Sequence, residues 1–317
     1  MEKLPERKLI VSSSPHIKSG RTTQNIMLDV IIALIPALIA GCVIFGLRAL
    51  AVVAACVSSA VLAEIIFNII CRRQHTISDL SAIVTGLLLG LNLPATIAIW
   101  QAVVGSVFAI VVVKCLFGGL GKNFANPAIT ARVMMLISFP SAMGAAAAVR
   151  VASVDAVASA TPLALMKAGE MPSQSIVDML LGLRSGAIGE TCIIALVLGG
   201  LYLLIRRVIT WHTPVVYICG VYLLSLLICG DAKLALYMLL SGGVFIGAIF
   251  MATDYVTTPT TPWGKVIFGL GCAVLTVVIR KWSAYPEGVS FSILLMNILT
   301  PYIEKATVKK PLGEVEA

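Results

Sequence analysis

Ten apolar stretches in this chain have lengths close to those that cross a lipid bilayer, and polar or proline-rich segments separate them. A helix needs about 20 apolar residues to cross the hydrocarbon core. Charged residues make up only 12% of the chain, whereas a typical soluble domain carries about 25%. The sequence therefore predicts an all-α polytopic membrane protein with ten transmembrane helices, at residues 26–47, 49–70, 80–93, 96–117, 127–139, 190–205, 214–229, 233–252, 265–280 and 288–303.

The lysines and arginines predict how the helices are oriented in the membrane. Ten crossings put both termini on one side. Fifteen basic residues fall in segments on the side of the termini, and seven fall in segments on the other side. Because positively charged loops are retained in the cytoplasm, we expect the tails at residues 1–25 and 304–317 to be cytoplasmic. The net charge of +8 is attributed to these loops, so it does not indicate a nucleic-acid partner.

The two halves of the chain share a pattern of short, proline-bordered stretches. Residues 80–93 and 127–139 are too short to cross alone, and the second half carries the breaks "TTPTTPWG" and "YPEG" at matching positions. Each half, 26–139 and 190–303, holds five stretches, so the halves must run in opposite directions. We therefore predict two inverted five-helix repeats, a pattern that places a binding site at their interface. Prolines that merely end helices are the alternative.

Several classes of site are excluded by what the sequence lacks. None of the eight cysteines is in C-x-x-C spacing and the three histidines are scattered, so the chain offers no clustered ligand set for an iron–sulfur or zinc centre. No basic run interleaved with aromatic residues indicates nucleic-acid binding. No glycine-rich nucleotide fingerprint is present, so NAD is expected to bind elsewhere.

The long polar segment 140–189 lies between the two halves, on the outer side of the membrane by the charge count. It contains "SVDAVASATPL", which resembles the acceptor motif of flavin transferase, the enzyme that esterifies FMN through its phosphate onto a threonine. Thr161 supplies the hydroxyl, and the small residues Ser159 and Ala160 leave room for a nucleotide. Asp155 is placed to help hold a metal ion on the phosphate.

Three further stretches carry a family resemblance that covers nearly the whole chain. They are "SSSPHIKSGRTTQNIML" (12–28), "FGGLGKNFANPAITARVMM" (117–135) and the segment from "MATDYVTTPTTPWG" to "NILTP" (251–301). Together they resemble the D subunits of Rnf complexes, the ion-translocating ferredoxin:NAD oxidoreductases of bacterial inner membranes. The homologous B subunit of the sodium-pumping NADH:quinone oxidoreductase is the alternative, but the short N-terminal tail favours the Rnf subunit.

The resemblance implies a fold similar to urea transporters and an electron-relay function. It implies FMN bound covalently to Thr161 and a second flavin, riboflavin, bound non-covalently within the helix bundle. The expected partners are the other Rnf subunits, which carry iron–sulfur clusters and flavins, a flavin transferase for maturation, and membrane lipid. The redox chemistry of such a subunit belongs to its cofactors.

Polar residues beside the breaks are candidates for the second flavin site. Asn123 and Asn126 stand at the break of the first half, and Thr253 and Asp254 stand at that of the second half. Amides and hydroxyls at broken helices are suited to hydrogen-bond a ribityl chain or a flavin ring edge. Arg132, within a predicted span, is expected to hold an anionic group or to pair with a carboxylate, because charge at membrane depth is costly.

Two other carboxylates near helix starts have a structural explanation. Asp29 and Asp79 are expected to cap helices, where a carboxylate accepts hydrogen bonds from free backbone N–H groups and favours the helix dipole.

Two other functions remain open from the residues alone. The span pattern equally suits a solute channel or transporter, or a purely structural membrane subunit. The segment from Asp155 to Thr161 separates these alternatives, since a channel needs no flavin acceptor.

Overall fold

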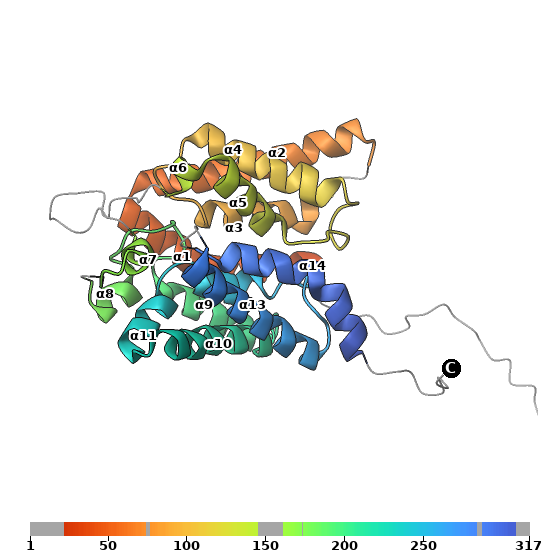
Figure 1. Cartoon of the computed structure of the whole chain (residues 1–317). Helices are drawn as coiled ribbons and strands as arrows, with labels where there is room; N and C mark the ends of the chain where they lie inside the picture. The colour runs from red at the N-terminus through yellow and green to blue at the C-terminus, as the bar shows by residue number, and fades with distance from the viewer. Residues whose placement is uncertain (1–21, 74–76, 145–160, 173, 284–286, 309–317) are drawn as a thin grey trace, which may run out of the picture.

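The computed structural model describes residues 22–73, 77–144, 161–172, 174–283 and 287–308. Within these ranges all regular secondary structure is helical and no strand occurs. The first half lies on one side of the molecule and the second half on the other, with α1, α9 and α14 between them (Figure 1).

The first half of the chain forms five main helical segments. They are α1 (Thr23–Phe45), α2 (Leu47–Ile70), α3 (Ser81–Leu91), α4 (Ile99–Phe108), which continues as the π-helical segment η2 (Ala109–Cys115), and α5 (Pro127–Ser138). Gly46 separates α1 from α2 with φ of 81°, a left-handed value that glycine adopts without strain. Pro127 occupies the first turn of α5, where its missing N–H costs nothing.

The second half repeats this order after three short helices. The connecting helices are α6 (Pro140–Gly144), α7 (Pro162–Lys167) and α8 (Ile176–Leu181). The second half consists of α9 (Ile193–Ile205), α10 (His212–Cys229), α11 (Ala232–Leu240), α12 (Val244–Ile246) with the π-helical segment η3 (Gly247–Met251), α13 (Pro262–Trp282) and α14 (Val289–Thr307). A short 3-10 turn, η1 (Ile77–Asp79), precedes α3.

The two halves meet through matching helices. Within the first half, α2 packs on α3 and α4, and within the second half α10 packs on α11 and α13. Between the halves, α1 packs on α9 and α5 packs on α14. The ends of α3, α5 and α14 therefore converge where the two halves touch, and both pockets described below lie there.

Four helices are long and apolar enough to cross a membrane. They are α1, α2, α10 and α13, and the pair α11 with α12–η3, bent by 64°, makes a fifth. Each of the ten predicted stretches overlaps a helix, but α3, α4–η2, α5 and α9 are shorter apolar helices. The chain is thus a multi-pass membrane protein, and prolines at residues 94 and 127 border two of its shorter apolar helices.

The tryptophans are placed as in membrane proteins. All four (Trp100, Trp211, Trp263 and Trp282) lie at helix ends and are between 57% and 74% exposed. Tryptophan is enriched at membrane interfaces because its ring is amphipathic. Large aliphatic side chains are exposed between these ends, for example Ile39, Leu62 and Leu198, which suits contact with lipid.

One expected helix cap is wrong. Thr22 caps α1, so Asp29 lies more than one turn inside the helix. Its carboxylate accepts a hydrogen bond from the hydroxyl of Tyr202 on α9 at 2.8 Å and pairs at 3.3 Å with Arg206, which directly follows α9. Asp79 precedes the N-cap residue Leu80, but its carboxylate accepts a hydrogen bond from the Ser81 N–H at the start of α3, at 2.8 Å, as a cap does.

Three basic residues that the charge count assigns to loops are buried instead. Lys114 is 2% exposed and pairs with Glu64 at 2.8 Å, while Arg184 and Arg280 are 3% and 4% exposed. These side chains do not face water.

Candidate functional site

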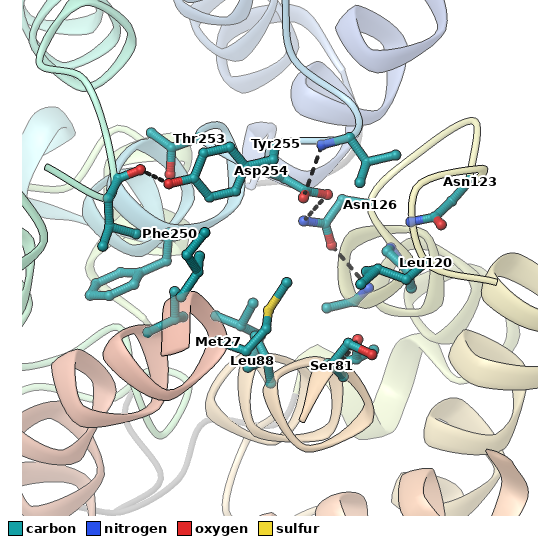
Figure 2. Close-up of a pocket in the computed structure, with 18 of the residues that line it drawn as sticks. Met27, Ser81, Leu88, Leu120, Asn123, Asn126, Phe250, Thr253, Asp254 and Tyr255 are labelled. Atoms are coloured by element: carbon teal, nitrogen blue, oxygen red, sulfur yellow. Dashed lines mark hydrogen bonds between the residues drawn. The ribbon is translucent and has the colours of Figure 1, made fainter. Parts of the chain in front are cut away.

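The first of two pockets, which we call the asparagine pocket, lies where α3 and α5 begin and α9 ends. It encloses about 750 Å³, open solvent included. Most of its wall is apolar, and Figure 2 shows Met27, Leu88 and Phe250 on one side of it, opposite a polar edge of Asn123, Asn126 and Asp254. An apolar pocket with a few placed polar groups is the usual form of a cofactor site.

The polar edge of the asparagine pocket is held by side chains from both halves. Asn126 caps α5 through its side-chain oxygen and donates its amide to Asp254 at 3.4 Å. Thr257 also donates to the Asp254 carboxylate, at 3.1 Å. Burial raises the pKa of the Asp254 carboxyl, and hydrogen bonds from the Val256 N–H and the Thr257 hydroxyl partly offset this shift. The Asn123 side-chain oxygen is buried without a hydrogen-bond partner among the described residues.

The second pocket, which we call the threonine pocket, lies where α3 ends and α14 begins. It encloses about 1190 Å³, open solvent included. Thr161 lies on its wall and is half-buried. The Thr161 hydroxyl caps α7 by accepting from the Ala164 N–H at 3.3 Å, so the short helix fixes this side chain on the pocket wall. The predicted motif residues Asp155, Ser159 and Ala160 lie outside the described residues.

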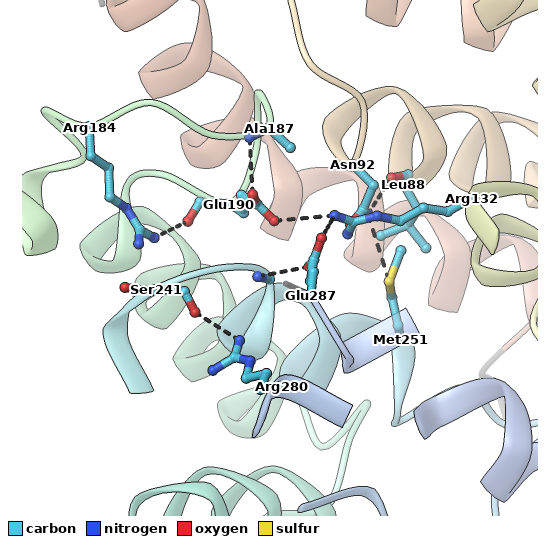
Figure 3. Close-up of polar contacts among 11 residues, drawn as sticks. Leu88, Asn92, Arg132, Arg184, Ala187, Glu190, Ser241, Met251, Arg280 and Glu287 are labelled. Atoms are coloured by element: carbon cyan, nitrogen blue, oxygen red, sulfur yellow. Dashed lines mark hydrogen bonds and ion pairs between the residues drawn. The ribbon is translucent and has the colours of Figure 1, made fainter. Parts of the chain in front are cut away.

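A network of buried charges forms the inner wall of the threonine pocket (Figure 3). Arg132 on α5 forms an ion pair with Glu287, which precedes α14, and a second one at 3.5 Å with Glu190, which precedes α9. Arg132 also donates to the side-chain oxygen of Asn92 at the end of α3. Arg132 was expected either to hold an anionic group or to pair with a carboxylate. In the structure it pairs with carboxylates.

The break between α11 and α12 makes room for this network. A Cβ atom on Gly243 would lie 2.8 Å from Glu287 Oε1 and 3.0 Å from Glu190 Oε2. The Gly243 N–H instead donates to Glu287 Oε1 at 3.1 Å. The absence of a side chain thus allows the two carboxylates to converge on Arg132.

Two more arginines flank the network, and neither pairs directly with a carboxylate of the described residues. Arg184 donates to the Glu190 carbonyl at 2.8 Å, and Arg280 donates to the Ser241 carbonyl at 3.0 Å (Figure 3). Burial lowers the pKa of the Arg184 guanidinium to about 10, although the carboxylate of Glu190 opposes this shift. Arg184 is therefore still charged at neutral pH.

The two pockets are separated by one turn of α3. Leu88 lines the asparagine pocket and Asn92 lines the threonine pocket, and four residues of α-helix rise by about 6 Å. The Asn92 amide donates to the Leu88 carbonyl at 2.7 Å and lies 3.7 Å from the Met251 sulfur. Asn92, Arg132 and Met251 therefore form the partition between the pockets.

The structure brings together the residues that the sequence indicated, but as two groups. Asn123, Asn126, Thr253 and Asp254 line the asparagine pocket, whereas Arg132 lies in the threonine pocket with Thr161. Sequence reasoning missed three members of the charge network, namely Glu190, Arg184 and Arg280. The only local signal was "RSGAIGET", which puts Arg184 and Glu190 directly before an apolar helix, where ionisable residues are candidates for function; it does not distinguish them from loop charges, and nothing local marks Arg280.

The described residues fit a flavin in both pockets. The asparagine pocket offers apolar walls for a flat ring and the unpartnered Asn123 oxygen at its edge. The threonine pocket offers the Thr161 hydroxyl and the buried guanidinium groups of Arg132 and Arg184, each with an Nε that has no partner among the described residues. Guanidinium groups are the usual partners of phosphate.

Comparison with known proteins assigns the chain to a family. The sequence model of the NQR2, RnfD, RnfE family matches residues 10–313. The chain is 47% identical to the D subunit of the Na(+)-translocating ferredoxin:NAD(+) oxidoreductase complex of Acetobacterium woodii, over 97% of this chain and 96% of that protein. It is 41% identical to the D subunit of the proton-translocating ferredoxin:NAD(+) oxidoreductase complex of Clostridium ljungdahlii, over 96% of both chains. It is 36% identical to the D subunit of the ion-translocating oxidoreductase complex of Marinobacter nauticus, over 98% and 97%. The chain therefore belongs to the NQR2, RnfD, RnfE family.

Proposed function

We propose that this chain is the membrane flavoprotein subunit of an ion-translocating ferredoxin:NAD oxidoreductase, in which it relays electrons. The three relatives are named as D subunits of ion-translocating oxidoreductase complexes, and they align over nearly the whole chain. The chain acts as one part of a larger enzyme. Other Rnf subunits supply the iron–sulfur clusters and the nucleotide sites, and a flavin transferase matures this one.

The observation that carries the proposal is the position of Thr161 on the wall of a pocket with a buried arginine network. The Thr161 hydroxyl is the acceptor of FMN, and esterification joins Oγ to phosphorus with the net loss of one water. Bound flavin supplies one- and two-electron redox chemistry. The chain's own residues hold the phosphate end near the guanidinium groups and exclude water with the apolar part of the wall.

The asparagine pocket is proposed as the site of a second, non-covalent flavin, riboflavin. Phe250, Leu88 and Met27 provide its apolar wall, and Asn123 and Asn126 provide amides at its edge. Because one turn of α3 separates the pockets, cofactors in them would be neighbours. Asn92 and Arg132 hold that partition in place through their hydrogen bond.

The proposed architecture is a ten-crossing bundle of two inverted five-helix repeats, similar to urea transporters, with both termini in the cytoplasm. Packing within the halves supports it: α2–α3, α2–α4 and α4–α5 correspond to α10–α11, α10–α13 and α13–α14. An odd number of crossings in each half reverses the direction of the second one. In this orientation the asparagine pocket faces the cytoplasm and Thr161 lies near the outer face.

A solute channel is the weaker proposal for this architecture. A channel needs a continuous passage, whereas the partition of Asn92, Arg132 and Met251 lies between two separate pockets.

Fluorescence of the denatured protein tests the proposal. Protein made in cells that contain a flavin transferase is run on a denaturing gel and viewed under ultraviolet light. We expect a fluorescent band for the wild type and a dark band for Thr161→Val and for protein made without the transferase. A dark wild-type band in the presence of the transferase contradicts the covalent assignment and favours a channel or a structural subunit.

A further inference from the structure

The charges of the described residues behind Thr161 do not balance. Among the described residues, the cluster contains three guanidinium groups (Arg132, Arg184 and Arg280) and two carboxylates (Glu190 and Glu287). Arg280 belongs to it because its Nη2 lies 2.9 Å from the position of a Cβ atom on Gly242, which lines the pocket. The formal charge of the cluster is therefore one positive unit.

The surplus charge is located on Arg184 within the pocket. Both carboxylates converge on Arg132, and Arg280 uses its two terminal nitrogens on the carbonyls of Met238 and Ser241. Arg184 donates from only one terminal nitrogen, to the carbonyl of Glu190, and its buried Nε, like those of Arg132 and Arg280, has no partner among the described residues. A buried charge without a partner is costly, so this group is suited to receive an anion.

We propose that Arg184 binds the phosphodiester that joins FMN to Thr161, as a positioning group for the tethered cofactor. This inference rests on the proposed function. A phosphodiester carries one negative charge at neutral pH, which equals the surplus charge of the cluster. Thr161 and Arg184 line the same pocket, so the anion is attached on one wall of the cavity that holds the guanidinium group. A planar guanidinium forms paired hydrogen bonds with phosphate oxygens that an ammonium group cannot reproduce.

If Arg184 binds the phosphodiester, attachment of FMN raises the melting temperature of the wild type, and the gain depends on Arg184. Without FMN, the surplus charge destabilises the native state, so Arg184→Gln in unmodified protein is expected to leave the melting temperature unchanged or to raise it. With FMN attached, the phosphate balances Arg184, and the wild type is expected to melt roughly 2–4 °C higher than its unmodified form. Arg184→Gln is expected to lose this gain, whereas Arg184→Lys keeps part of it because it keeps the charge.

The experiment is a melting series on the purified full chain, made with and without a flavin transferase, for the wild type, Arg184→Gln, Arg184→Lys and Thr161→Val. Intact mass first establishes which samples carry the ester. A wild type without the ester contradicts the proposed function and this inference with it. If the ester is present and raises the melting temperature equally in the wild type and in Arg184→Gln, the inference about Arg184 is contradicted while the proposed function stands.

A lipid headgroup is the other source of the same phosphate chemistry. Unmodified wild type is therefore melted with added phosphatidylglycerol and with added phosphatidylcholine. We expect no difference between the two lipids. A gain with phosphatidylglycerol that Arg184→Gln abolishes assigns the site to lipid and overturns the proposal.

A phosphorus NMR measurement keeps the proposal testable if Arg184→Gln does not fold. The phosphodiester signal of the native wild type is expected to be displaced from its position in Arg184→Lys and from its position after denaturation. A native wild-type signal that coincides with that of Arg184→Lys contradicts contact between the phosphate and Arg184.

Discussion

Arg132 on α5, which is buried, and Glu287 ahead of α14, whose side chain is 16% exposed, form an ion pair across 155 positions of the chain. The pair joins the two halves where α5 packs on α14. It also forms the inner wall of the pocket that contains Thr161. One contact therefore links the assembly of the halves to the geometry of the candidate flavin site.

Removing the cation from this pair is expected to be strongly destabilising. Arg132→Gln leaves the carboxylates of Glu190 and Glu287 facing each other in a buried site, at a cost of about 3–5 kcal/mol. The double change Arg132→Gln with Glu287→Gln is expected to recover part of the loss, because it removes one of the two carboxylates. Melting of the purified variants in detergent measures the effect, with exposed Lys233→Gln as a control. Equal losses for the single and double variants contradict the pairing.

The lack of a side chain at Gly243 is expected to be essential for the contacts of Glu190 and Glu287 with Arg132. Gly243→Ala puts a methyl group within 3.0 Å of oxygens from both Glu287 and Glu190, so one of them must move away from Arg132. Gly144 serves as a matched control: it also lines the pocket, and a Cβ atom there meets nothing within 4 Å. We expect Gly243→Ala to lower the melting temperature and Gly144→Ala to leave it nearly unchanged. The reverse order is incompatible with the network.

The two remaining ion pairs are expected to differ in strength because their burial differs. Lys114 and Glu64 are each 2% exposed, so Lys114→Met leaves a buried carboxylate without its cation, at about 3–5 kcal/mol. The side chain of Arg206, which pairs with Asp29, is 56% exposed, so Arg206→Met is expected to change stability little. Chemical unfolding of the two variants under identical conditions measures the loss of stability in each. A larger loss for Arg206→Met than for Lys114→Met contradicts the prediction.

The amide of Asn126 is expected to matter for a non-covalent flavin more than for folding. Asn126→Ser keeps a residue that caps α5, whereas Asn126→Leu removes the cap and costs about 1 kcal/mol. Both variants lose the amide that holds Asp254 at the pocket edge. The amount of riboflavin released by denaturation, measured by chromatography, is expected to fall in both variants. Full retention of riboflavin in folded Asn126→Leu contradicts the assignment of riboflavin to the asparagine pocket.

Local chemistry makes part of this structure predictable. Apolar runs predict where helices lie, because membrane helices need continuous apolar surface. Asn126 with Pro127 predicts a helix start, because an asparagine cap followed by proline is a local signal. The four polar residues beside the breaks lie together as expected, since short polar segments at helix breaks meet at the interface of the halves.

Long-range pairing is not predictable from local patterns. Asp29 lies near a helix start, where a cap is expected, but its partners are Tyr202 of α9 and Arg206 directly after it. Arg184 and Lys114 resemble loop charges in the sequence, because a residue's burial at a helix end depends on how the halves dock. No periodicity in one segment specifies a partner more than a hundred residues away.

The mass of the intact protein tests the central claim most directly. The full chain is purified from cells with a flavin transferase, alongside Thr161→Val from the same cells. The account predicts that the wild type exceeds its sequence mass by one FMN less one water, that proteolysis places this increment on the peptide containing Thr161, and that Thr161→Val has its unmodified mass. A wild type at its unmodified mass, or an increment that survives in Thr161→Val, would contradict it.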